Sequence, residues 1–319
     1  MQKYRNNIIC GDCIELLGRV KTPFADLIFA DPPFNIGYQY DKYHDKVHKD
    51  KYIQWTRDWM SACIKALKPH GSFYIAIGDD YAAHIRLLGD ELGLNLRNWI
   101  IWHYTFGQQT RAKFARAHTH IFYFTRDPKH FTFNDGAVRV PSDRRLIYND
   151  KRAEAKGKMP DDVWNTFSRI CGTFKERQGW HPCQMPELLL ARIIAVSSNP
   201  GDLVLDPFSG SGTTAAAAAQ LKRAYCGIDI SNTYVQNSKI RLAELKKAPS
   251  AGTLNAFETL ELKRLFFEIG RPIDNYLGSD KLPSIAAGQF ALRMNNGKTY
   301  RPEQIVSALR ELITWPMKK

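Results

Sequence analysis

Short apolar runs alternate with amphipathic segments through residues 1–132 of the chain. Strands are predicted where apolar residues follow one another, at 8–9, 26–30, 72–77, 99–102 and 121–124. Helices are predicted where apolar residues recur at helical spacing, at 14–17, 52–67 and 82–92. Strand and helix units of this length are typical of an α/β fold with a mostly parallel sheet and helices on both faces.

The alternation stops near residue 133 and returns near residue 185. The second stretch predicts helices and strands in turn, at 185–198, 203–205, 215–219 and 225–230. Between the two stretches, residues 136–158 carry seven basic and three acidic side chains, a net charge of +4, which favours a binding role. Helices are predicted again at 254–269 and 301–312. The expected organisation is therefore one α/β domain in two halves, residues 1–132 and 180–248. An insert, residues 133–179, separates the halves, and a small helical appendage, residues 249–319, follows them.

The charge balance indicates a polyanionic partner. The 319 residues include 45 Lys and Arg against 32 Asp and Glu, so the formal charge is +13 and nucleic acid is the first candidate. No stretch of eighteen uninterrupted apolar residues and no apolar leader occurs, which predicts a cytoplasmic protein without membrane contact. Cys10 and Cys13 form a C-x-x-C that could be a redox pair or half a zinc site. Because no second C-x-x-C follows, no metal is predicted.

A glycine-rich turn, Asp206 to Thr214, follows one predicted strand and opens a helix. Its glycines allow a ligand to approach the backbone, and the helix N-terminus offers free N–H groups. The turn is neither a Walker A loop nor a G-x-G-x-x-G fingerprint. The next strand ends at Asp229, where nucleoside-binding folds place an acid on ribose hydroxyls. The alternative interpretation is a tight connecting turn and a solvated aspartate.

Asp31-Pro32-Pro33-Phe34 ends a buried strand with two residues that fix their own φ and lack an N–H. With the glycine-rich turn it resembles the β-group amino-methyltransferases, which modify DNA bases using S-adenosylmethionine. The resemblance covers residues 7–245 and includes Gly11-Asp12-Cys13, Phe208 to Gly212, and His181 to Pro186, where Cys183 and Met185 replace the family's Thr and Lys. It implies a Rossmann-like methyltransferase fold in permuted order, because the catalytic turn precedes the cofactor loop. That order argues against glutamine and many RNA adenine methyltransferases.

The resemblance also implies the functional residues. The catalytic ones are Asp31, Pro32, Pro33 and Phe34. The S-adenosylmethionine site comprises Asp12, Cys13, Asp31, His181, Gln184, Asp206, Phe208, Ser209, Gly210, Ser211, Gly212, Thr213 and Asp229. Chemically, the Asp31 carboxylate and the Pro32 carbonyl can accept hydrogen bonds from the two N–H groups of an exocyclic amine. Phe34 can stack on a base flipped out of the duplex. Tyr38 and Tyr40 either line the base pocket or are surface aromatics.

Double-stranded DNA is the expected partner, and the insert at 133–179 is the candidate target-recognition region. The residues predicted to contact it are Arg111, Lys113, Arg116, Arg139, Arg144, Arg145, Lys151 and Arg152. We expect adenine N6 to be methylated rather than cytosine N4, since D-P-P-F is more usual for adenine in the family. The alternatives are a cytosine N4 enzyme, an RNA methyltransferase, and a non-catalytic DNA-binding subunit, against which the intact Asp31, Phe34 and Asp229 argue. The C-terminal helices are assigned either to DNA binding or to a homodimer.

Overall fold

The computed structural model describes residues 2–108, 110–148, 150–172, 174, 176–245, 254–278 and 281–313, excluding the side chains of 106–108. The chain forms two compact units, Met1–Phe133 with Asp162–Lys247, and Asn134–Asp161 with Ala248–Lys319. The predicted insert, 133–179, therefore divides between them, with 134–161 in the second unit and 162–179 in the first. The predicted boundary between 248 and 249 lies outside the described residues. No helix in the described ranges is long and apolar enough to cross a membrane.

The first unit is built on a sheet that contains eight described strands. In sheet order they are β1 (Asn7–Cys10), β8 (Ala224–Asp229), β7 (Leu203–Asp206), β2 (Ala25–Ala30), β3 (Leu67–Ile77), β5 (Arg116–Thr125), β4 (Asn95–Gln108) and β6 (Val163–Trp164). Neighbours pair in parallel except that β5 runs antiparallel to both β3 and β4. This confirms the predicted mostly parallel α/β sheet. Strands β7 and β8, late in the chain, lie between β1 and β2, as the permuted order requires.

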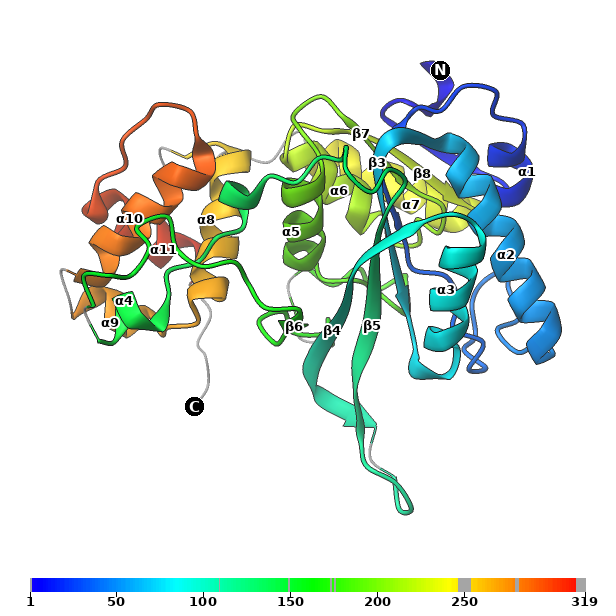
Figure 1. Ribbon diagram of the computed structural model, residues 1–319, viewed down its shortest axis with the longest axis horizontal. Coiled ribbons are helices and arrows are strands. Elements are labelled where there is room, and N and C mark those ends of the chain that lie inside the picture. The colour runs from blue at the N-terminus through cyan, green and yellow to red at the C-terminus, as the bar shows by residue number, and fades with distance from the viewer. Residues whose placement is uncertain are drawn as a thin grey trace. The chain divides into compact units, whose positions relative to one another are not determined.

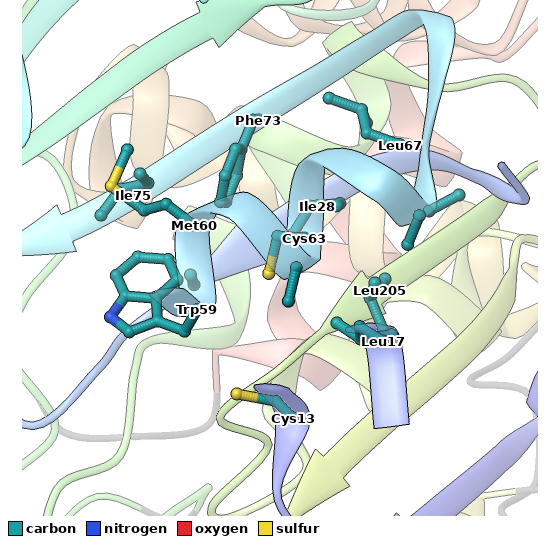
Figure 2. Close-up of a cluster of buried hydrophobic side chains, with 14 of the residues drawn as sticks. Cys13, Leu17, Ile28, Trp59, Met60, Cys63, Leu67, Phe73, Ile75 and Leu205 are labelled. Atoms are coloured by element: carbon teal, nitrogen blue, oxygen red, sulfur yellow. The ribbon is translucent and has the colours of Figure 1, made fainter. Parts of the chain in front are cut away.

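Helices cover both faces of this sheet (Figure 1). One face carries α1 (Cys13–Gly18), α2 (Lys49–Ala66) and α3 (Asp79–Glu91), and the other carries α5 (Glu187–Ser197), α6 (Thr213–Gln220) and α7 (Asn232–Leu245). The core beneath α2 joins its Trp59, Met60 and Cys63 to Phe73 of β3 and Leu205 of β7 (Figure 2). Helix α7 was not predicted, because polar side chains occupy most of its positions.

The second unit is mainly helical. It contains α4 (Asp143–Leu146), α8 (Ala256–Ile269), α9 (Ile273–Leu277), α10 (Lys281–Met294) and α11 (Pro302–Leu312), besides a short 3-10 turn, η2 (Asp135–Ala137); the other such turn, η1 (Gln2–Tyr4), begins the first unit. Helices α8 and α11 confirm the predicted ones, whereas α9 and α10 were not predicted. Segment 134–161 is tied to these helices because Gln289 donates to the carbonyls of Arg139 and Lys156. In the first unit, by contrast, β6 pairs with β4, which attaches the chain after residue 162 to the sheet.

Candidate active site

The predicted catalytic turn and cofactor loop meet at the carboxyl ends of two neighbouring strands. Ile28 of β2 is level with Leu205 of β7, so Asp31 and Asp206 leave the sheet close together. The chain after β7 enters α6 on one face, and the chain after β2 leads to α2 on the other. Such a switch point leaves a crevice in which α/β proteins bind ligands. A cavity of about 190 Å³ opens there.

Most residues predicted to bind the cofactor line this cavity. They are Asp12, Cys13, Asp31, His181, Asp206, Phe208, Ser209, Gly210, Ser211, Thr213 and Asp229. Gln184 and Gly212 do not line it and instead shape the loops around it. The Gln184 side chain accepts the N–H of Gln178 at 2.7 Å and donates to the Glu176 carbonyl at 2.8 Å. Gly212 begins α6 with φ +71°, and a Cβ there would lie 2.8 Å from the Ser238 hydroxyl.

Helix α7 fixes the glycine-rich loop from behind. The Ser238 hydroxyl donates to the Gly210 carbonyl at 3.1 Å. The buried Arg241 guanidinium donates to the Ser211 carbonyl and to the Thr213 hydroxyl, each at 2.9 Å, and forms an ion pair with Glu187 at 3.2 Å. Because these hydrogen bonds come from the side of the loop that faces α7, the opposite side of the loop is left to line the cavity. The supporting roles of Ser238 and Arg241 were not predicted from sequence.

Arg241→Met is expected to weaken S-adenosylmethionine binding by roughly tenfold, because two hydrogen bonds to a charged donor that hold the loop are lost. Titration calorimetry with the cofactor measures this loss. Lys239→Met, an exposed change on the same helix, is the matched control and should bind normally. Unchanged cofactor affinity in a folded Arg241→Met protein would contradict the supporting role.

Asp229 organises the same loop. Its carboxylate accepts the N–H of Gly210 and the N–H of Ser231, each at 2.8 Å. Burial raises the pKa of this carboxyl group, and the two N–H donors oppose the rise. Each carboxylate oxygen has two lone pairs, so Asp229 can still accept hydrogen bonds from ribose hydroxyls in the cavity.

Asp12 and Cys13 lie where β1 ends. Asp12 caps α1 by accepting the N–H groups of Ile14 at 2.7 Å and Glu15 at 3.2 Å. Burial, followed by the charge of Asp12, raises the pKa of the Cys13 thiol to about 12, so this cysteine is a neutral part of the cavity wall. Cys10 is exposed. The two cysteines therefore occupy unlike environments.

The predicted catalytic turn, residues 31–34, is held through its third residue. The Tyr52 hydroxyl donates to the Pro33 carbonyl at 2.5 Å. Within the described part of the chain the Pro32 carbonyl accepts no hydrogen bond, which leaves it available to a substrate amine. Buried Asp45 accepts the N–H groups of Asn35 and Tyr38, at 2.6 and 3.1 Å, and so shapes the chain that follows the turn.

Pro32 and Phe34 do not line the cavity, in contrast to Asp31 and Pro33. The Phe34 ring is partly buried against Gly78, where an added Cβ would lie 3.2 Å from its Cδ2 atom. Tyr40 lines the cavity, and Tyr38 is 38% exposed with its ring centre 5.5 Å from that of Tyr40. Of these two tyrosines, Tyr40 is thus the one that the structure places at the site.

The floor of the cavity is acidic. Burial, and then the neighbouring Asp206 charge, raises the pKa of Asp31 to about 7, whereas Arg169 opposes the rise. Burial likewise raises the pKa of Asp206 to about 7, although Thr214 and the Phe208 N–H donate to it. Carboxyl groups perturbed in this way mark a candidate functional site, and a positively charged ligand would favour their ionised forms. Such a donor set fits S-adenosylmethionine, which carries a sulfonium, an ammonium group and hydroxyls.

His181 contributes a neutral ring. Burial lowers the pKa of its imidazole to about 4. The ring lies over the glycine-rich loop, because a Cβ on Gly210, whose φ is +47°, would lie 2.7 Å from the His181 Nε2 atom. This close approach explains a glycine at position 210, independently of any ligand.

Several residues of the cavity wall were missed from sequence. They include Lys42, Tyr43, Trp55, Ile230, Ser231 and Tyr234. Trp55 comes from α2, and its ring centre lies 5.7 Å from that of Phe208 in the cofactor loop. Helical spacing assigns Trp55 only to a helix. Its place in the wall depends on how α2 packs, for which the sequence holds no local signal.

The predicted DNA contacts fall into two groups. In the first unit Arg111 and Lys113 are exposed between β4 and β5, whereas Arg116 forms ion pairs with Asp79 and Asp80 at 2.8 and 3.4 Å. In the second unit Lys151 is exposed. The arginines there make contacts inside the unit: Arg139 with Asp135, Arg145 with the Ala155 carbonyl, and Arg144 and Arg152 with Asp150.

Comparison with known proteins gives a consistent result. The N6/N4 DNA methylase family matches residues 25–240. Type II methyltransferase M.HpaI of Haemophilus parainfluenzae is 39% identical over 236 residues, 74% of this chain and 73% of the relative. DNA adenine methyltransferase YhdJ of Escherichia coli K12 is 37% identical over 243 residues, 74% of this chain and 82% of the relative.

Among solved structures, the complex of M1.HpyAVI with S-adenosylmethionine has a TM-score of 0.55 at 22% identity, covering 74% of this chain and 98% of that one. At this identity it supports the fold. The family match, the two relatives and the acidic crevice at the switch point agree with one another. The chain belongs to the N6/N4 DNA methylase family, whose members are S-adenosylmethionine-dependent amino-methyltransferases that act on DNA.

Proposed function

We propose that this enzyme methylates the N6 amine of adenine at a specific sequence in double-stranded DNA. The observation that carries the proposal is the pairing of Asp31 with the unengaged Pro32 carbonyl on one rigid turn beside the cavity. A relative of similar length is named a DNA adenine methyltransferase, which supports adenine over cytosine. An amine inside a duplex cannot reach such a turn, so the base must leave the stack.

The turn would act mainly by orientation. The Asp31 carboxylate and the Pro32 carbonyl accept hydrogen bonds from the two N–H groups of the amine. These hydrogen bonds turn the lone pair of the amine nitrogen toward the cofactor. When bound, S-adenosylmethionine supplies the methyl group on a sulfonium. Asp31 can take the proton that the amine loses as the new C–N bond forms. Phe34 and Tyr40 are the aromatic rings that we assign to the base.

The cofactor would lie across the ends of β1, β7, β8 and β2. We assign Asp229 to the ribose hydroxyls and Asp12 with Cys13 to the edge of the adenine. The glycine-rich loop, residues 208–213, and His181 would border the methionine part of the cofactor. Target recognition, expected of residues 133–179, is assigned here to segment 134–161, the part of that insert that lies in the second unit and in which Lys151 is exposed.

The decisive experiment supplies methyl-labelled cofactor with duplex DNA or with RNA and identifies the labelled nucleoside. We expect N6-methyladenine from duplex DNA. Label in N4-methylcytosine would contradict the choice of base. Label confined to RNA would contradict the choice of substrate.

Turnover is expected to fall as the pH drops below about 7, because Asp31, whose pKa is about 7, loses its negative charge on protonation and can no longer take the proton of the amine. Stability should change in the opposite direction. A carboxyl group whose pKa rises from 3.8 to about 7 on folding stabilises the folded state when protonated, and this contribution is lost as the pH rises through about 7. Asp206 titrates in the same range, so the two groups act as a coupled pair.

Single-turnover rates and urea unfolding of the ligand-free enzyme, both measured from about pH 5.5 to 8.5, test this prediction. The rate should rise with pH while the free energy of unfolding falls. A rate that stays constant between about pH 6 and 8 would show that the ionisation of Asp31 does not limit turnover.

A further inference from the structure

Strands β4 and β5 form a hairpin that continues past the edge of the sheet at which the site lies. Ile77, the last residue of β3, is level with His120 of β5, and His120 is level with Ile101 of β4. Strand β4 runs on to Gln108 and β5 begins at Arg116, so both extend beyond that level. Figure 1 shows the two strands projecting beyond the other strands of the sheet. The projection starts from the carboxyl edge, where β2 leads into Asp31.

The end of this hairpin presents an aromatic ring between cations. Phe114 is 99% exposed, whereas the next most exposed large apolar side chain in the described ranges, Tyr148, is 74% exposed. Arg111 and Lys113 beside it are exposed, and no acid occurs from residue 92 to residue 126. A ring with almost its whole surface in water adds nothing to the folded protein. Its environment suits a polyanion that offers an apolar contact.

The base of the hairpin is connected to the predicted catalytic turn through the start of α3. Arg116 forms ion pairs with Asp79 and Asp80 at the start of α3. Those acids follow Gly78, against which the Phe34 ring lies. Few intervening residues therefore separate the hairpin from the turn that receives the base. From His120 to Phe114 an extended strand spans at most about 20 Å, a distance comparable to the width of a DNA duplex.

We propose that Phe114 is a wedge that enters the base stack of the DNA substrate beside the flipped base, while Arg111 and Lys113 contact the flanking phosphates. This inference rests on the proposed function, since only an enzyme that flips a base from duplex DNA needs such a wedge. Flipping leaves neighbouring bases unstacked, and an inserted apolar side chain replaces part of the lost contact. Phe114 is thus a positioning residue that favours the extruded base without touching the reacting atoms.

The test compares paired and unpaired targets. The methylated position is first mapped by sequencing modified bases in DNA from cells that express the enzyme. Two duplexes are then made, one with the target base paired and one with it opposite an abasic site, so that flipping costs less. With the paired duplex, Phe114→Ala should lower kcat/KM by roughly 5- to 150-fold, the factor that corresponds to one aromatic–base stack. With the abasic duplex the loss should shrink to less than about threefold.

Two further variants sharpen the result. Phe114→Trp keeps a stacking ring and should stay within about threefold of the wild type on both duplexes. Leu87→Ala, which removes another exposed apolar side chain of the same unit, should match the wild type throughout. Thermal unfolding of Phe114→Ala should be unchanged, because the Phe114 side chain is 99% exposed.

The outcomes separate the two hypotheses. An equal loss on both duplexes would show a groove or phosphate contact only and would overturn the wedge, as would no loss on the paired duplex. If the wild-type enzyme labels RNA alone, the proposed function fails and the wedge with it. If the wild type labels duplex DNA and Phe114→Ala does not discriminate between paired and abasic targets, the wedge alone fails.

Discussion

Replacing Asp31 with asparagine is expected to reduce the methyl-transfer rate by about 10²- to 10⁴-fold while the enzyme still binds its cofactor. Asparagine retains the shape of the side chain but loses the charge that accepts the amine N–H and, later, its proton. It also removes the repulsion between Asp31 and Asp206, which after burial is the second cause of the raised pKa of Asp31. Cofactor affinity should therefore fall far less than the rate, because Asp206 and Asp229 still line the cavity. Single-turnover rates at saturating DNA and cofactor measure the loss.

Asp58→Asn, an exposed change on α2, is the matched control and should leave the rate unchanged. The pH dependence gives a second readout, since the residual rate of Asp31→Asn should no longer rise with pH through about 7. A variant that bound cofactor normally and kept its rate within about tenfold of the wild type would remove Asp31 from the catalytic role.

Replacing Asp229 with alanine is expected to weaken cofactor binding by at least about 100-fold, because charge-assisted hydrogen bonds contribute roughly 1.5–3 kcal/mol each. The alanine side chain leaves the N–H groups of Gly210 and Ser231 without their acceptor. It also removes the acid that we assign to the ribose hydroxyls. Both effects act on binding, so KM for the cofactor should rise far more than kcat falls.

Titration calorimetry with S-adenosylmethionine and with its demethylated product measures the loss, which should be similar for the two ligands because both carry the ribose. Asp229→Asn retains one acceptor oxygen and should lose less affinity than Asp229→Ala. Asp58→Ala serves as the control for removal of a surface acid. Full cofactor affinity in Asp229→Ala would contradict both the assignment to the ribose hydroxyls and the role of Asp229 in holding the loop for the cofactor.

The motifs that indicate the reaction could be recognised from the sequence because the constraints on their backbone are local. Two adjacent prolines fix the turn at 32–33 whatever surrounds it. Position 210 requires glycine because its φ is positive and the His181 ring lies close to it. The end of a strand can be predicted from the polar residue that follows an apolar run. The strands of the α/β core were predicted for the same reason. Helix α7 was not, because eight of its fourteen positions are polar, although it supports the predicted cofactor loop.

The boundary of the insert shows a different limit. The polar, basic character of 133–179 suggested one module, yet 134–161 joins the helical unit and 162–179 returns to the sheet. Two residues of β6 determine that return by pairing with β4. A strand of two residues leaves no periodicity to detect, so only the assembled sheet reveals it.

By itself the sequence determined the chemistry of the site: an acid and a carbonyl on a rigid turn, a glycine-rich loop, and an acid at the end of the next strand. These follow from residue type and short spacing, which act on the backbone within a few residues. Only the tertiary structure decided which side chains close the cavity and that Tyr52 holds the Pro33 carbonyl. It also decided that burial beside the cavity raises the pKa of Asp31 and of Asp206 to about 7. Contacts and dehydration of this kind arise between residues far apart in the chain, so they exist only once the sheet and its helices are packed.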